Sequence, residues 1–545
     1  MKRRILICLL IMLSCFSLTS CKENENNQNE EPERKTEYMI KDDNLIAKEV
    51  KDDNYRVFYE IFTGSFSDSN GDGVGDLQGI INRLDYLNDG DPNSGKSLGI
   101  EGIWLTPIFS SPSYHKYDVT NYYKIDEKFG TMDDLTKLIE ECHKRDIKII
   151  LDLVINHTGK NNLWFQNFMR AHENNDPSDP YYDFYSYCKP DGDRTKGTFN
   201  KLGKSDDYYE CNFSSEMPEL NYDNIAVREK VLEIAKYYLD MGVDGFRFDA
   251  AKYIYFGNNV KSAEFWEWYV AELKKIKSDI YVVGEVWDND ATMDIYNQAG
   301  LSCFNFTMSE QSGYICRTAK GKSSVSAYTD YIESSLEKLN GYNKNVMIHQ
   351  FISNHDMDRI AGYLTIESGE AYMAANIYIL SHGSPFIYYG EEIGIKGVRG
   401  GASTDANRRL KMLWGDDDTI KNPTGSTYKE KNQINGTVAE HILDKDSLYN
   451  HYKKLIMIRK AYPEIARGEF VSLKSYNTKV GGFISTYENS SVCVIHNTGT
   501  ESVTIDLVDL GAQQFKLLCT FVGKGDAKLD GSKLVIGPMT SVILK

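Results

Sequence analysis

Four short segments of this 545-residue chain combine carboxylates with histidines or an arginine, and each follows an apolar run typical of a buried β-strand. Because parallel strands end at one face of a sheet or barrel, groups at these positions can gather at a single site. Cleavage of a glycosidic bond needs two carboxyl groups at one site: one attacks or stabilises the anomeric carbon, and the other protonates the leaving oxygen. The segments are Asp152-Leu-Val-Ile-Asn156-His157, Gly245-Phe-Arg247-Phe-Asp249-Ala-Ala-Lys252, Gly284-Glu285-Val-Trp287 and Ser353-Asn354-His355-Asp356.

The positions of Asp249 and Glu285 fit these two roles. Arg247 precedes Asp249 by two residues, so both side chains face the same side of one strand, and a nearby cation favours the ionised aspartate. Glu285 lies beside Val283 and Val286, where burial would raise its pKa and keep it protonated. A retaining site would hold the two carboxyl groups about 5 to 5.5 Å apart. The structural alternative is that these acids cap helices or pair with arginines.

In order and residue types, the four segments resemble the four sequence regions of the α-amylase family of glycoside hydrolases, retaining (β/α)8-barrel enzymes that act on α-glucans. The resemblance implies that Asp249 is the nucleophile, that Glu285 is the acid and base, and that Asp356 stabilises the transition state. It also implies a set of substrate-binding side chains, two of which, Arg359 and Asp118, we expect to pair across the site. This set is Tyr117, Asp118, His157, Arg247, Lys252, His355 and Arg359.

Two further segments bear on which glucan is cut. Met217-Pro-Glu219-Leu-Asn221 resembles the form found in members intermediate between α-amylases, oligo-1,6-glucosidases and neopullulanases, although the usual pattern has Asp where Glu219 stands. Ala250-Ala-Lys252 resembles endo-acting α-amylases, because 1,6-cleaving members tend to have Val directly after the nucleophile. The sequence thus favours hydrolysis of internal α-1,4 bonds of starch-like glucans and maltooligosaccharides. The alternatives are a neopullulanase-like, oligo-1,6-glucosidase-like or transglycosylating enzyme, or a non-catalytic glycan-binding barrel.

A glycine-rich loop after the first strand-like run has the composition of a calcium site. Side-chain oxygens stand at its positions 1, 3, 5 and 9, and a backbone carbonyl is available at position 7, a spacing that can wrap a hard cation. Gly79 stands where an EF-hand has a bidentate glutamate, and the loop instead resembles the calcium loop after the first barrel strand of many family members. A solvated turn without metal is the alternative. The expected Ca²⁺ ligands are Asp68, Asn70, Asp72, Val74 and Asp76.

Two features stay open at this point. Asn156 resembles a ligand of the family's interdomain calcium site, but Tyr253 replaces the histidine whose backbone normally contributes there. Cys188 and Cys211 fall in one segment and could form a disulfide, which their spacing does not establish.

Alternating strand-like and helix-like patterns predict an α/β fold, a (β/α)8 TIM barrel of residues 55–157 and 214–467. The polar segment 158–213 is too long for a simple loop and predicts a small domain inserted after the third strand. Short β-type runs predict a C-terminal antiparallel β-sandwich over 468–545. The expected barrel strands are 55–62, 101–108, 147–155, 245–249, 281–287, 303–308, 346–353 and 384–389.

The N-terminus carries the pattern of a bacterial lipoprotein signal. Three basic residues at positions 2–4 precede an apolar run too short to cross a bilayer, and Leu-Thr-Ser-Cys21 matches a lipobox. We therefore expect residues 1–20 to be a signal peptide, Cys21 to be lipidated, and the polar residues 21–54 to be a disordered tether. An ordinary cleaved signal peptide or a short buried helix is the alternative.

The charge of the chain limits its partners. A formal net charge of −17 argues against nucleic acid and against anionic membrane surfaces, since both attract basic patches. The negative charge does not oppose the binding of a neutral polysaccharide. We expect a monomer on the extracellular face of a bacterial membrane, held there only by a lipid anchor at Cys21, with α-glucan polysaccharides and oligosaccharides as substrates.

Overall fold

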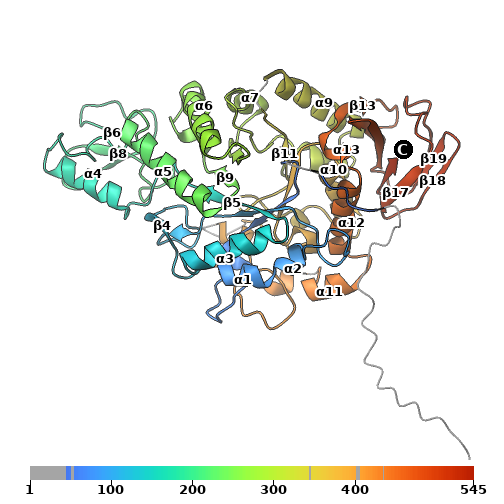
Figure 1. Cartoon of the computed structure of the whole chain (residues 1–545), viewed down its shortest axis with the longest axis horizontal. Coiled ribbons are helices and arrows are strands. Elements are labelled where there is room, and N and C mark those ends of the chain that lie inside the picture. The colour runs from blue at the N-terminus through green and yellow to red at the C-terminus, as the bar shows by residue number, and fades with distance from the viewer. Residues whose placement is uncertain (1–44, 51–53, 343–344, 400–404, 434) are drawn as a thin grey trace, which may run out of the picture. The chain divides into compact units, whose positions relative to one another are not determined.

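The structure is a computed structural model that describes residues 45–50, 54–342, 345–399, 405–433 and 435–545 (Figure 1). The predicted signal peptide, the lipidation site Cys21 and most of the predicted tether lie outside the described residues. Within the part of the chain that the structure describes, no helix is both long and apolar enough to cross a membrane.

Seven strands form one sheet in the order β10-β9-β5-β2-β1-β12-β11, and all neighbouring strands are parallel. A parallel bridge joins Gly284 of β10 to Cys303, and the next residue, Phe304, forms a second bridge to His349 of β11. The sheet therefore closes into the predicted (β/α)8 barrel, with these bridging residues in place of a full strand at 303–308. The strands are β1 (Phe58–Ile61), β2 (Gly102–Leu105), β5 (Lys148–Leu153), β9 (Gly245–Phe248), β10 (Tyr281–Gly284), β11 (His349–Gln350) and β12 (Ser384–Tyr388).

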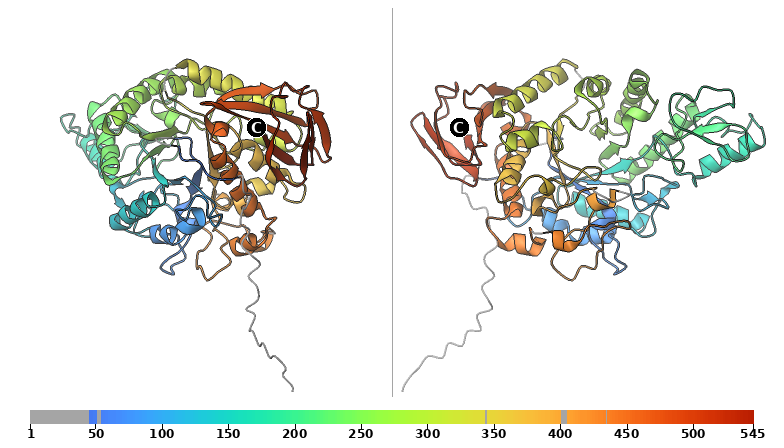
Figure 2. Two further views of the ribbon diagram at one scale, coloured as in Figure 1. Left: turned by 45° about the vertical axis from the view of Figure 1, so that its right-hand side comes forward. Right: turned by 180° about the vertical axis from the view of Figure 1, so that it is seen from behind.

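Helices follow the strands along the chain and lie around the outside of the barrel (Figure 2). Their ends follow local sequence signals: Thr131 and Asp134 form a capping box before α3, and Gly242 ends α5 with a φ of 109° that favours glycine. The helices are α1 (Leu77–Asn82), α2 (Leu84–Leu87), α3 (Met132–His143), α5 (Ile225–Met241), α6 (Asn259–Ile276), α7 (Asp290–Gln298), α8 (Tyr314–Ala319), α9 (Val325–Tyr342), α10 (Glu370–Ile379), α11 (Val438–Leu443), α12 (Leu448–Ala461) and α13 (Glu464–Arg467).

Aromatic side chains fill the middle of the barrel. The Phe58 ring stacks on Phe386 with 4.8 Å between ring centroids and packs against Tyr281 at 4.5 Å. The neighbouring strand carries Gly102 at this level, where an added Cβ would lie 2.4 Å from the Phe58 ring. Because side chains alternate along a strand, Glu60 faces the same interior as Phe58. A buried carboxylate therefore stands inside the barrel, next to the aromatic layer.

The segment between β5 and α5 forms α4 (Leu163–Glu173) and a three-stranded antiparallel sheet in the order β6-β8-β7. Cys188 pairs with Tyr208 in this sheet, and Cys211 lies three residues further along, about 10 Å away. A disulfide needs a Cα separation below about 7 Å, so the bridge left open by the sequence does not form, and both cysteines are free thiols. The strands of this sheet are β6 (Tyr187–Cys188), β7 (Phe199–Lys201) and β8 (Tyr208–Glu210). A separate two-stranded sheet, β3 (Phe109–Ser110) and β4 (Asn121–Ile125), lies earlier in the chain, between β2 and α3.

Two antiparallel sheets follow α13, one in the order β13-β14-β15-β20-β17 and one in the order β16-β19-β18. Buried apolar side chains such as Val480, Ile495 and Leu534 form one cluster drawn from both sheets, as expected for the predicted sandwich. The strands are β13 (Glu469–Leu473), β14 (Val480–Tyr487), β15 (Ser490–Asn497), β16 (Val503–Asp506), β17 (Leu518–Gly523), β18 (Ala527–Asp530), β19 (Lys533–Ile536) and β20 (Thr540–Leu544).

Candidate active site

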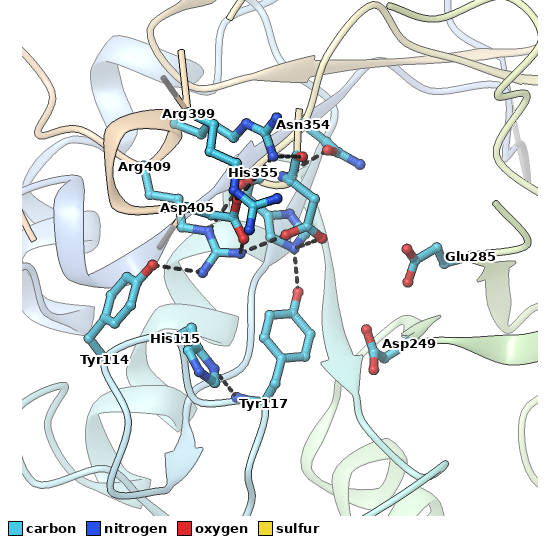
Figure 3. Close-up of polar contacts among 12 residues, drawn as sticks. Tyr114, His115, Tyr117, Asp249, Glu285, Asn354, His355, Arg399, Asp405 and Arg409 are labelled. Carbon is cyan, nitrogen blue, oxygen red and sulfur yellow. Dashed lines mark hydrogen bonds and ion pairs between the residues drawn. The ribbon is translucent and has the colours of Figure 1, made fainter. Parts of the chain in front are cut away.

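The three predicted catalytic acids lie together at the carboxyl ends of the barrel strands. Asp249 directly follows β9, Glu285 directly follows β10, and Asp356 follows β11. All three line one cavity with a volume of about 780 Å³. Figure 3 shows the carboxyl groups of Asp249 and Glu285 facing the same space, as two groups acting on one bond must.

The guanidinium of Arg247 joins these carboxyl groups. Its Nη1 donates to Asp249 at 2.9 Å and to Asp152 at 2.7 Å, and its Nη2 donates to Glu285 at 2.7 Å. Arg247 is only 1% exposed, so water screens these ion pairs little. Ala250, in the left-handed region with a φ of 47°, turns the chain after the nucleophile and donates its backbone N–H to Glu285 at 3.0 Å. Such backbone strain is typical of active sites.

Burial sets the protonation states of the two acids. It raises the pKa of Asp249 to about 6, although Arg247 opposes the shift. It raises the pKa of Glu285 to about 7, again against Arg247. The predicted cation is present beside Asp249 and favours its ionised form, but the effect of burial on the pKa of Asp249 is larger. Between these two pKa values Asp249 is ionised while Glu285 holds a proton, the pair of states that nucleophilic attack with acid catalysis requires.

Asp356 carries a permanent negative charge. Burial alone would raise its pKa, but His355 and Arg409 hold the pKa of Asp356 well below its usual value. The Nε2 of His355 lies 3.0 Å from one carboxylate oxygen of Asp356, and the Nη2 of Arg409 lies 2.6 Å from the other. Asp356 is thus a fixed anion at the cavity wall, able to accept hydrogen bonds from sugar hydroxyls.

Three of the seven predicted substrate-binding residues line the cavity: Tyr117, His157 and Lys252. Burial lowers the pKa of His157 to about 4, so its ring is neutral. Lys252 is held in place by the carbonyl of Trp287 at 2.7 Å and by Asp288 at 3.0 Å. Four predicted residues do not contribute to the lining: Asp118, Arg247, His355 and Arg359.

The predicted ion pair between Arg359 and Asp118 is wrong. The guanidinium of Arg359 donates to the backbone carbonyls of Tyr389 at 2.7 Å and Arg408 at 2.9 Å. Asp118 instead accepts a hydrogen bond from the Ser111 hydroxyl at 2.5 Å. The carbonyls that follow β12 bind Arg359, and local hydroxyls bind Asp118, so neither group is available to the other.

Arg409 is a site residue that sequence reasoning missed. Besides Asp356, its guanidinium contacts the hydroxyl of Tyr114 at 3.1 Å and so links the loop after β2 to the segment after β12 (Figure 3). His115 and Asp405 line the cavity on the same side. Tyr114 and His115 precede a predicted residue, Tyr117, by three and two positions and could have been found from it. Arg409 follows an irregular segment without strand periodicity, and no sequence signal pointed to it.

Aromatic rings also line the cavity. Phe213, from the inserted segment, packs against Tyr253 with 4.9 Å between ring centroids, and Trp287 stacks on Phe306 at 5.2 Å. Phe213 is 47% exposed and Trp287 is 41% exposed, so both present ring faces to solvent. Exposed ring faces at a cavity suit the apolar faces of sugar rings.

The predicted calcium loop has the right donor types, and the structure shows how they are used. Both carboxylate oxygens of Asp68 accept backbone N–H groups of the loop, including that of Gly73 at 2.7 Å. Asp76 caps α1 through the N–H of Gly79 at 2.6 Å. No cluster of three or more acidic, histidine or cysteine side chains suited to a metal occurs among the residues that the structure describes. The oxygen donors fit Ca²⁺ by chemistry, but binding would require Asp68 to release some of these contacts.

Asn156, the candidate ligand of a second calcium site, contacts a second buried side chain. Its side-chain amide donates to Glu219 at 2.5 Å. Burial raises the pKa of Glu219 well above its usual value, so this pair is held without a net charge. The contact ties the end of β5 to the Met217-Pro-Glu219 segment through the Asn156 amide nitrogen. The Asn156 amide oxygen, the atom that would bind a cation, is buried without a hydrogen bond among the described residues.

Comparisons with known proteins agree with this geometry. The chain matches the model "Alpha amylase, catalytic domain" over residues 60–468 and the model "Alpha-amylase SusG C-terminal domain" over residues 480–543. It is 36% identical to alpha-amylase 3 of Dictyoglomus thermophilum, covering 90% of this chain and 93% of that one, and 29% identical to an oligo-1,6-glucosidase of Bacillus cereus, covering 85% and 94%.

A comparison with solved structures gives the same result. The structure of Eubacterium rectale Amy13B superposes with a TM-score of 0.84 at 34% identity, covering 92% of this chain and 97% of that one. Three findings support the same assignment: the barrel is closed and parallel, the three carboxyl groups cluster at one cavity, and the catalytic-domain model matches most of the chain. The chain belongs to the α-amylase catalytic-domain family, the retaining GH13 glycoside hydrolases.

Proposed function

We propose that this protein is an α-amylase that hydrolyses internal α-1,4 bonds of starch-like glucans and maltooligosaccharides with retention of configuration. The observation that carries the proposal is the meeting of Asp249, Glu285 and Asp356 at one cavity in complementary protonation states. The similarity to an alpha-amylase supports the α-1,4 preference. The Ala250-Ala-Lys252 segment supports internal cleavage.

In the first step, the Glu285 carboxyl donates its proton to the glycosidic oxygen while a carboxylate oxygen of Asp249 attacks the anomeric carbon. The bond to the leaving sugar breaks, and a glycosyl ester forms on Asp249. The negative charge of the pair moves from Asp249 to Glu285. Because Arg247 contacts both carboxyl groups, this cation stays paired during the transfer.

In the second step, ionised Glu285 takes a proton from water, and the water oxygen attacks the anomeric carbon of the ester. Asp249 leaves as a carboxylate, and Glu285 regains its proton. Two displacements at one carbon give net retention. Asp356 would accept hydrogen bonds from hydroxyls of the distorted sugar ring and so favour the oxocarbenium-like transition state.

A product profile tests this proposal. Purified enzyme should release mixed maltooligosaccharides from amylose from the start of the reaction, with the initial α-anomer seen by proton NMR, and should leave isomaltose intact. A β-anomer as first product would contradict the retaining assignment. Cleavage of isomaltose in preference to amylose would overturn the α-1,4 assignment.

The second candidate is an oligo-1,6-glucosidase-like, neopullulanase-like or transglycosylating activity. Its support is the similarity to the oligo-1,6-glucosidase of Bacillus cereus and the Met217-Pro-Glu219 form of the inserted segment. Panose from pullulan, or products longer than the starting oligosaccharide, would favour it.

Calcium and the lipid anchor complete the proposal. The donor types of Asp68, Asn70, Asp72 and Asp76, with the Val74 carbonyl, support a Ca²⁺ ion that stiffens the loop after β1 without taking part in the chemistry. The lipobox at Cys21 supports an extracellular enzyme anchored to a bacterial membrane and acting as a monomer on glucans too large to enter the cell.

A further inference from the structure

A buried glutamate on β1 lies behind the site and outside the cavity lining. Glu60 is 2% exposed and faces the barrel interior. Its Oε1 accepts hydrogen bonds from the Nδ1 of His355 at 2.5 Å and from the backbone N–H of His355 at 3.3 Å. A buried carboxylate is costly unless it is paired, so His355 accounts for the charge of Glu60.

The other ring nitrogen of His355 also faces oxygen atoms. Its Nε2 lies 2.6 Å from the Tyr117 hydroxyl and 3.0 Å from the carboxylate of Asp356. The Tyr117 hydroxyl lies 3.0 Å from Asp152, whose two oxygens accept from Arg247. Asp152, bound to Arg247 in this way, can only accept from Tyr117. The Tyr117 oxygen is then left to accept from Nε2 of His355.

These contacts fix the proton count of His355. One nitrogen donates to Glu60, and the other donates toward Tyr117 and Asp356, so both nitrogens carry a proton and the ring is an imidazolium. Burial favours the neutral ring, but Asp356 and Glu60 raise the pKa of His355 to about 10. The edge of the Trp104 indole packs against the same ring and adds no charge.

We propose that Glu60 is a positioning residue that keeps His355 doubly protonated, so that His355 holds Asp356 ionised and aimed at the substrate. The three groups form a row from the barrel interior to the cavity wall: the Glu60 carboxylate, the His355 imidazolium and the Asp356 carboxylate. The proposal rests on the assigned role of Asp356 in the proposed function. It differs from a direct sugar contact by His355, whose side chain is fully buried and does not line the cavity.

Two carboxylates, those of Asp356 and Glu60, stabilise the positive charge of the His355 ring. Arg409, from the segment after β12, donates to the backbone carbonyl of His355 at 3.0 Å, and Arg247, from β9, lies 3.5 Å from the Tyr117 hydroxyl that contacts His355. Both cations oppose a further positive charge on the ring. Asp356 already shares its charge with Arg409. Without the Glu60 charge, the shared carboxylate of Asp356 is the remaining ion-pair partner of the His355 ring among the described residues, so the buried ring should lose a proton.

The first test is spectroscopic and does not depend on activity. The chain has ten histidines, and the ¹⁵N signals of the His355 ring can be assigned as those missing from the spectrum of His355→Gln. In the wild type, both ring nitrogens of His355 should be protonated from about pH 5 to 8. In Glu60→Gln, one of them should lose its proton in that range. A neutral His355 ring in the wild type at pH 7 would overturn the proposal whether or not Glu60→Gln folds.

The second test is kinetic. Glu60→Gln should lower kcat on maltooligosaccharides at least about tenfold while KM changes less than about twofold, because the variant weakens charge placement in the transition state rather than glucan binding. Glu60→Asp, which keeps the charge, should recover part of kcat. Wild-type kcat in Glu60→Gln would refute the proposal.

The matched control is Glu392→Gln. Glu392 is also a fully buried glutamate at the barrel, bonded to the hydroxyls of Tyr59 at 2.6 Å and Tyr86 at 2.5 Å, away from the cavity lining. It should lower Tm like Glu60→Gln but leave kcat and the His355 signals unchanged. If Asp249→Asn is inactive while Glu60→Gln is normal, the inference fails and the proposed function stands. If wild-type enzyme cleaves no α-glucan, the function itself fails.

Discussion

Asp249 and Glu285 bind the two ends of one guanidinium, Nη1 of Arg247 at 2.9 Å and Nη2 at 2.7 Å. In the proposed mechanism the negative charge crosses from the first acid to the second, and both stay within the reach of the same buried cation. A lysine has a single ammonium and could not face both carboxyl groups in this way. Charge transfer within the pair therefore requires no movement of a countercharge.

Removing either acid should stop catalysis without unfolding the protein. Asp249→Asn eliminates the covalent step, and Glu285→Gln eliminates proton transfer, so each should lower kcat on amylose by several orders of magnitude. Circular dichroism and Tm should show a folded protein. Activity above about a tenth of wild type in either variant would reject its assigned role.

The two roles can be separated with an activated substrate. A 4-nitrophenyl maltoside has a leaving group that departs without a proton, so Glu285→Gln should still form the glycosyl ester on Asp249. Azide, a nucleophile that needs no general base, should then release a glycosyl azide and restore turnover. The same addition should leave Asp249→Asn inactive, and rescue of both variants alike would contradict the assignment.

The pH profile of kcat/KM should be bell-shaped and narrow. Activity needs ionised Asp249, so it should rise as pH increases through about 6. Activity also needs protonated Glu285, so it should fall as pH increases through about 7. Initial rates on maltooligosaccharides far below KM measure these ionisations in the free enzyme. A profile that is flat from about pH 5 to 9 would show that other groups carry the proton transfer.

Much of this site could be predicted because its chemistry lies at strand ends. Asp249 and Glu285 each follow a short apolar run, and the parallel packing of these strands brings the two acids together. The sequence next to each acid is therefore enough to predict its place. Arg409 could not be predicted in the same way, since its place depends on how an irregular segment folds over the barrel. The missing disulfide has a similar cause: the register of β6 and β8, rather than residue spacing, separates Cys188 from Cys211.

The aromatic rings of Phe213 and Tyr253, which line the cavity, should bind the leaving-group side of the substrate. Phe213→Ala and Tyr253→Ala should each raise KM for long maltooligosaccharides about fivefold, the loss expected for about 1 kcal/mol of stacking. Hydrolysis of a short nitrophenyl glycoside should change little. Tyr476→Ala is the control, because this tyrosine is fully exposed in the loop between β13 and β14 and does not line the cavity. Equal effects in all three variants would exclude a specific ring contact.

Calcium should stabilise the fold if the Asp68–Asp76 loop binds it. A ligand that binds only the folded protein raises Tm by mass action, so a chelator should lower Tm and added calcium should restore it. Asp72→Ala should abolish this response, and its kcat should approach that of chelated wild type. Asp193→Ala, which removes an exposed turn aspartate of the inserted segment, is the matched control and should keep the response. An identical melting curve with and without chelator would leave a polar turn without metal.

The last prediction concerns the N-terminus and does not depend on the barrel. If Cys21 is diacylated, the protein should fractionate with membranes and enter the detergent phase, with the catalytic domain accessible to protease added outside the cell. Cys21→Ser should release the protein to the medium or leave it unprocessed, while kcat of the purified domain should not change, because the lipid takes no part in the chemistry. Mass spectrometry of the mature N-terminus is the direct measurement. A wild-type protein that is fully soluble in the medium and begins downstream of Cys21 would exclude the anchor and leave the enzymatic assignment intact.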